Sequence, residues 1–88
     1  MLETHAAMMA ALKLTAAQTE WLLIAYRAGY DHGFSARYNR ALGRLAALGY
    51  IERNPTSLRN WRIVGNLPEH VDRMLTELNR DRAAKRAR

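Results

Sequence analysis

Two glycines, Gly29 and Gly49, limit the helices that the middle of this chain can form. Each follows a segment whose apolar residues recur at helical spacing, and glycine readily takes the left-handed conformation that ends a helix. The chain has 88 residues and no cysteine, so no disulfide is available to hold it together. We therefore expect one small domain around a single compact core.

A capping box marks the start of the first of these segments. Thr15 precedes Ala-Ala-Gln, so its hydroxyl and the glutamine side chain can satisfy backbone amides at a helix start. This pattern predicts a helix over Ala16–Ala28. Ser35 is the next N-cap candidate and predicts a helix over Ala36–Leu48, in which Tyr38 belongs to the apolar stripe that faces the core.

The remaining segments predict a hairpin and two terminal helices. Residues 50–53 and 58–64 are rich in β-formers on either side of a turn-prone stretch, which indicates a β-hairpin. Leu67 opens a last helical pattern, with a proline in the position that helix starts tolerate. The expected class is mainly α with a small β-hairpin (α+β). The predicted organisation is a single domain over 1–88, with an N-terminal helix at 1–13, a core at 14–65, a C-terminal helix at 66–79 and a basic tail at 80–88 that is frayed at its end.

Positive charge is concentrated in the centre of the chain and at its C-terminal end. The sequence has 14 Lys and Arg against 8 Asp and Glu. Residues 27–62 carry seven arginines against two acids, and residues 80–88 carry five bases against one acid. The planar guanidinium suits bidentate contact with phosphates and guanine edges, so a polyanionic partner is expected. The alternative is that the arginine content reflects a GC-rich genome.

The sequence lacks the residue sets of common enzyme and metal sites. His5, His32 and His70 lie far apart, no cysteine is present, and no glycine loop of the phosphate-binding kind appears. We therefore expect no enzyme activity, no metal and no cofactor. The longest apolar run, Trp21–Tyr26, is too short to span a bilayer, and Glu3 stands where a secretory signal carries positive charge. These features favour a cytoplasmic protein without a membrane span.

The stretch from Tyr38 to Arg53 reads YNRALGRLAALGYIER and is followed by Trp61-Arg62-Ile63. This text and the order of the predicted elements resemble the winged-helix DNA-binding family, especially MarR-type and ArsR-type bacterial regulators. The resemblance implies that the helix ending at Gly49 is a recognition helix and that the hairpin is the wing. The sequence departs from the family in one respect. Only Tyr30–Phe34 lie between the predicted helices, so the scaffold helix of a full helix-turn-helix is shortened or missing.

The resemblance also implies a contact surface for double-stranded DNA. Residues at the helix start would approach base edges, because arginine suits guanine and asparagine suits adenine. Residues further along the helix and on the wing would contact phosphates or the minor groove. The alternative is a solvated arginine face, partly paired with Glu52. Tyr38 and Trp61 are assigned to the core rather than to base stacking. The candidate DNA-binding residues are Ser35, Arg37, Asn39 and Arg40 at the helix start, Arg44 further along it, and Arg53, Asn54, Arg59 and Arg62 on or beside the wing.

The terminal helices occupy the positions through which MarR-type proteins dimerise. We therefore expect a homodimer through the N- and C-terminal helices, which would present two recognition helices to a pseudo-palindromic site. Apolar residues at both ends, Leu2, Met8, Met9, Leu75 and Leu78, are difficult for a small monomer to bury. The alternative is that both helices pack on the core of their own chain.

The predicted function is that of a bacterial or phage transcriptional regulator that occupies a promoter site as a dimer, and the sequence leaves open whether it is a repressor or an activator. One alternative is an architectural, excisionase-like factor that directs recombination. The other is a winged-helix module that binds a protein, such as a phage-encoded inhibitor of a host protein.

Overall fold

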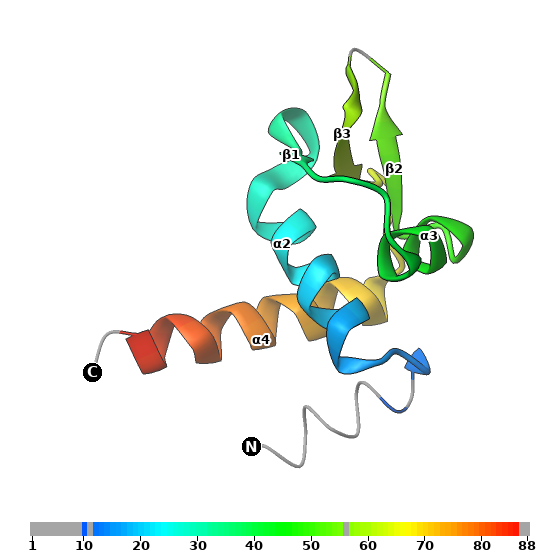
Figure 1. Cartoon of the computed structure of the whole chain (residues 1–88). Helices are drawn as coiled ribbons and strands as arrows, with labels where there is room; N and C mark the ends of the chain where they lie inside the picture. The colour runs from blue at the N-terminus through cyan, green and yellow to red at the C-terminus, as the bar shows by residue number, and fades with distance from the viewer. Residues whose placement is uncertain (1–9, 11, 56, 87–88) are drawn as a thin grey trace.

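The fold combines helices with a small antiparallel sheet. A computed structural model of the chain describes residues 10, 12–55 and 57–86. This α+β arrangement confirms the predicted class (Figure 1). Of the predicted N-terminal helix, only Ala10, Leu12 and Lys13 lie within the described residues. The elements are α2 (Ala16–His32), β1 (Phe34–Ser35), α3 (Arg40–Ala47), β2 (Ile51–Asn54), β3 (Ser57–Ile63) and α4 (Glu69–Arg86).

Helix α2 begins where the capping box predicts and ends later than expected. The Thr15 hydroxyl accepts a hydrogen bond from the Gln18 amide at 3.1 Å, and the Thr15 amide donates to Gln18 Oε1 at 3.0 Å. Gly29 has a φ of 85° and interrupts the helical geometry at the predicted stop. One further turn nevertheless continues to His32, and the helix ends at Gly33, whose φ is 67°. The predicted end at Ala28 is therefore one turn too early.

The prediction that Ser35 caps a helix over 36–48 is wrong. Ser35 lies in β1, where it pairs with Asn60 of β3, and its neighbour Phe34 pairs with Trp61. The cap is Asn39, whose Oδ1 accepts a hydrogen bond from the Leu42 amide at 2.9 Å. Helix α3 therefore starts at Arg40. Both Ser35 and Asn39 have the chemistry of an N-cap, and pairing with β3 assigns Ser35 to the sheet.

The sheet has the strand order β1-β3-β2, with β3 in the centre. Strands β2 and β3 form the predicted hairpin. Ile51 lies opposite Ile63, and both are buried. Their neighbours Glu52 and Arg62 also lie opposite each other, on the other face of the sheet because successive side chains of a strand alternate. The sheet therefore covers the core with one face and carries an ion pair on the other.

The core is shared by α2, α3, the sheet and α4. Leu75 and Leu78 of α4 are buried within the chain. The C-terminal helix thus packs on the core of its own chain, which was the alternative to burial in a dimer. The homodimer remains a prediction, and Leu2, Met8 and Met9 lie outside the described residues. The buried apolar residues are Leu14, Leu22, Leu23, Ala25, Leu42, Leu45, Ile51, Trp61, Ile63, Val71, Met74, Leu75 and Leu78.

Helix α4 is longer than predicted. It continues to Arg86, so the expected basic tail is helical over residues 80–86. Neither α4 nor any other helix in the described part of the chain is both long enough and apolar enough to cross a bilayer. Polar contacts hold α4 against α2, and we call them the α2–α4 seam. They are Tyr26 Oη with Thr76 Oγ1 at 2.8 Å, Arg27 Nε donating to Asn79 Oδ1 at 2.8 Å, and Arg82 donating through both Nη atoms to Glu20.

The Glu20–Arg82 pair shifts the titration of its carboxylate. Hydrogen bonds from Arg82 hold the pKa of Glu20 below its usual value, and partial burial opposes them. The Glu20 side chain keeps 47% of its exposure, so solvent screens the pair and its contribution to stability is at most about 1 kcal/mol.

Candidate nucleic-acid interface

Helix α3 presents two arginines on the side away from the core. Leu42 and Leu45 are fully buried and fix the inward face of the helix. Arg40 and Arg44 lie one turn apart and are exposed on the opposite face, as the angle of about 100° per residue requires. The prediction that Arg37, Arg40 and Arg44 all lie on the helix over Ala36–Leu48 is wrong, because Arg37 precedes the helix. Two arginines occupy the helix, and Arg37 lies in the connection before it.

The connection between β1 and α3, residues 36–39, is held at both ends. The indole Nε1–H of Trp61 donates to the Ala36 carbonyl at 3.1 Å. At the other end, the Asn39 side chain caps α3. Arg37 and Tyr38 therefore lie between two fixed points, and both are exposed.

Tyr38 does not belong to the core, contrary to prediction. Its relative exposure is 65%, whereas Trp61 is 3% exposed and is a core residue as expected. The two ring centroids are 6.5 Å apart. The phenol lies over Gly43 of α3, where an added Cβ would come within 2.8 Å of the Tyr38 Cζ atom. The tyrosine ring is thus supported from below and open to solvent.

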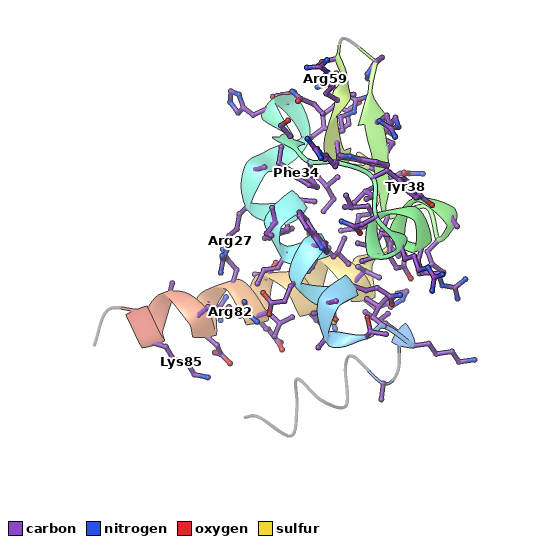
Figure 2. The ribbon with its side chains drawn as sticks, viewed as in Figure 1. Arg27, Phe34, Tyr38, Arg59, Arg82 and Lys85 are labelled. Atoms are coloured by element: carbon purple, nitrogen blue, oxygen red, sulfur yellow. The ribbon has the colours of Figure 1, made fainter. Side chains whose placement is uncertain are left out.

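Tyr38 lines a hollow between the 36–39 connection and the hairpin, which we call the Tyr38 groove. Its volume is about 640 Å³. The guanidinium of Arg53 lies 4.4 Å from the centroid of the ring of Trp61, its partner across the hairpin, in a cation–π contact. Figure 2 shows Arg59 high on the hairpin and Tyr38 beside α3. The residues that line the groove are Ser35, Ala36, Arg37, Tyr38, Arg53 and Arg59.

Three of the candidate DNA-binding residues are not fully exposed. Asn39 caps α3, and Asn54 is 7% exposed. Arg62 forms an ion pair with Glu52 at 2.6 Å and lies over the Tyr30 ring, 4.2 Å from its centroid. The helix cap and the ion pair give Asn39 and Arg62 structural roles. The candidates that are exposed are Ser35, Arg37, Arg40, Arg44, Arg53 and Arg59.

The exposed candidates lie on a surface with little negative charge. Glu52 is the only acidic residue between Gly33 and Asn66, and Arg62 neutralises it. Within the described part of the chain, no carboxylate forms an ion pair with the four exposed candidate arginines that lie outside β2. The positive charge of α3, the 36–39 connection and the hairpin is therefore directed to solvent. These four arginines are Arg37, Arg40, Arg44 and Arg59.

Sequence reasoning missed Tyr38 as a surface residue. It placed Tyr38 in the core because helical spacing was counted from Ser35. A signal was present, since Asn39 is as good an N-cap as Ser35 and a helix starting at Arg40 leaves Tyr38 outside it.

Exposed arginines beside an open aromatic ring suit an anionic partner with planar groups. No family model, no curated protein and no solved structure matches the chain.

Proposed function

We propose that this protein binds double-stranded DNA through α3 and the β2–β3 hairpin, as a winged-helix transcriptional regulator in the cytoplasm of a bacterium. The observation that carries the proposal is a basic surface made by exposed arginines that have no ion-paired carboxylate in the described part of the chain. Arg40 and Arg44 lie on α3, Arg37 and Arg59 line the Tyr38 groove, and Arg62 pairs with Glu52, the one acid between Gly33 and Asn66. Phosphate contacts dominate the affinity of proteins for DNA, so such a surface is the first requirement.

The dimensions of α3 support insertion into the major groove. An α-helix with its side chains is about 10–12 Å across and the major groove is about 12 Å wide, so the eight-residue α3 can lie in the groove. The exposed face also includes Ala47, a small residue that allows close approach. Arg40, in the first turn, is proposed to read base edges, and Arg44 to hold a phosphate.

The hairpin is proposed to act as the wing. It projects from the body of the fold, away from α4 (Figure 1). Arg53 and Arg59 lie on the side of the hairpin that faces the 36–39 connection. Contacts from these side chains would reach the sugar-phosphate backbone beside the bound helix. The short strand β1 stands where the resemblance places a scaffold helix, so α3 would be oriented by the sheet.

The test is binding to labelled duplex DNA over a series of salt concentrations, measured by fluorescence anisotropy. Each phosphate contact adds about 0.9 to the slope of log affinity against log salt. Arg44→Ala should therefore lower this slope by about one for every sequence. Arg40→Ala should weaken binding to the preferred sequence by about 1–3 kcal/mol and relax its base preference. Selection from a random duplex pool supplies that sequence.

Arg27→Ala is the matched control. It removes the same charge from α2, on the side of the molecule away from Tyr38 (Figure 2). Equal losses for Arg27→Ala and Arg44→Ala would reduce the binding to general basicity and refute the interface. Affinity for a protein that persists at high salt, together with no enrichment of any duplex, would favour the protein-binding alternative.

A further inference from the structure

We propose that the Tyr38 groove holds an unpaired base next to the bound duplex, so that the preferred DNA has a single-stranded end or an extruded base beside the site. This inference rests on the proposed function, because the duplex on α3 brings its backbone to the groove. It names a substrate feature that a basic surface alone does not explain.

The first support is the state of the Tyr38 ring. It is 65% exposed, although a phenol ring ordinarily buries much of its area. The ring is also held in place. Its connection is anchored through Ala36 and Asn39, and Gly43 leaves the space that the phenol occupies. A fixed aromatic ring that is open to solvent provides a surface on which a base can stack with little loss of side-chain entropy.

The second support is the charge around the ring. Arg37, Arg53 and Arg59 line the same groove, and the Ser35 hydroxyl adds a donor and an acceptor. Proteins that bind single-stranded nucleic acid combine a positive groove for the backbone with aromatic side chains for the bases. The volume of the groove is about 640 Å³, which lies within the usual range of small-molecule sites. The groove therefore has more room than one phosphate needs.

The third support is the inaccessibility of base faces in an intact duplex. Each base is stacked between its neighbours, so a protein ring reaches a base face only when the base is unpaired or extruded. Tyr38 adjoins α3 directly, being the residue before its cap. A DNA strand that leaves the duplex at the N-terminal end of α3 would therefore enter the groove.

The test compares three DNAs: a blunt duplex, the same duplex with a short thymine overhang, and the duplex with an abasic overhang. The abasic overhang keeps the phosphates and removes the bases. The wild-type protein should bind the thymine overhang about 5- to 150-fold more tightly than the other two, which is the range of one base–aromatic stack. Tyr38→Ala should abolish this preference. Tyr38→Phe should retain it, since stacking needs the ring and not the hydroxyl.

Tyr30→Ala serves as the control, because Tyr30 is an exposed tyrosine that lines a different hollow. It should leave the preference intact. Equal affinity of the wild-type protein for all three DNAs would overturn the inference and leave duplex binding standing. Tighter binding to both overhangs than to the blunt duplex would show phosphate contacts without stacking, which also overturns it. A thymine preference that depends on Tyr38, together with no effect of Arg40→Ala or Arg44→Ala, would uphold the groove and refute the duplex interface.

Discussion

Gly33 should be the least replaceable glycine in the chain. Its φ of 67° and ψ of −165° lie in a region that only glycine occupies readily, and Gly29, with φ 85° and ψ 167°, lies in the same region. An alanine at either position should cost about 1–3 kcal/mol in backbone strain. The two sites differ in their surroundings. No atom lies within 4 Å of a Cβ at Gly29, whereas a Cβ at Gly33 would overlap the carbonyl oxygen of Trp61 and lie 3.3 Å from its carbon.

Relief of this overlap requires β1 to move away from β3. The β1–β3 ladder consists of two residue pairs, and each hydrogen bond contributes about 0.5–1.5 kcal/mol net. Gly33→Ala should therefore lower the free energy of unfolding by about 1–3 kcal/mol more than Gly29→Ala does. This difference is large beside a total stability of about 4–13 kcal/mol for a chain of this length.

The assay is urea unfolding of both variants, followed by circular dichroism and by tryptophan fluorescence. A difference of 1–3 kcal/mol corresponds to a separation of the midpoints by about 1 M or more when m is about 1 kcal/mol/M. Gly33→Ala should also weaken binding at the Tyr38 groove, because β1 positions the 36–39 connection. Equal destabilisation by the two substitutions would refute the steric argument and leave backbone strain as the whole effect.

Two further predictions concern the helix cap and the α2–α4 seam. Asn39→Ala should lower the free energy of unfolding by about 1 kcal/mol, while Ser35→Ala should cost less than half of that, because Asn39 and not Ser35 caps α3. Equal costs in thermal denaturation would contradict this assignment. Glu20→Gln should destabilise the protein by at most about 1 kcal/mol at neutral pH, because it removes the ion pair with Arg82. Since the pKa of Glu20 is lowered in the folded state, this stabilisation is present above the unfolded value of about 4.3 and is lost as the pH falls through the folded value. The two proteins should therefore converge in stability at acid pH, and a gap that does not depend on pH would refute the linkage.

The sequence predicted those parts of the fold that are determined by residues close to one another along the chain. The Thr15 capping box starts α2, and Gly49, with a φ of 83°, follows α3 as expected. The hairpin was also predicted, since its strands and turn are contiguous. The start of α3 was not, because the choice between Ser35 and Asn39 is made by β3, far along the chain. The end of α4 was missed for the same reason: the helix continues where Arg82 contacts Glu20.

The candidate site divides in the same way. The sequence identified the basic residues of the site, because charged residues can be located in a sequence without knowledge of the fold. The burial of Asn54 and the pairing of Arg62 could not be, since both depend on the register of the hairpin. The Tyr38 groove was also not predicted. It exists because β1 joins β3 and leaves Tyr38 in a connection instead of a helix.

The narrowness of the sheet has a consequence for behaviour at high protein concentration. Exposed strand edges recruit other chains and promote aggregation, and short, charged or bulged edges resist it. One edge here is β1, only two residues long. The other is β2, which carries Glu52 and Arg53, breaks register between Arg53 and Asn54, and is followed by Pro55. A second molecule therefore finds little backbone to extend, and self-association through cross-β pairing is disfavoured.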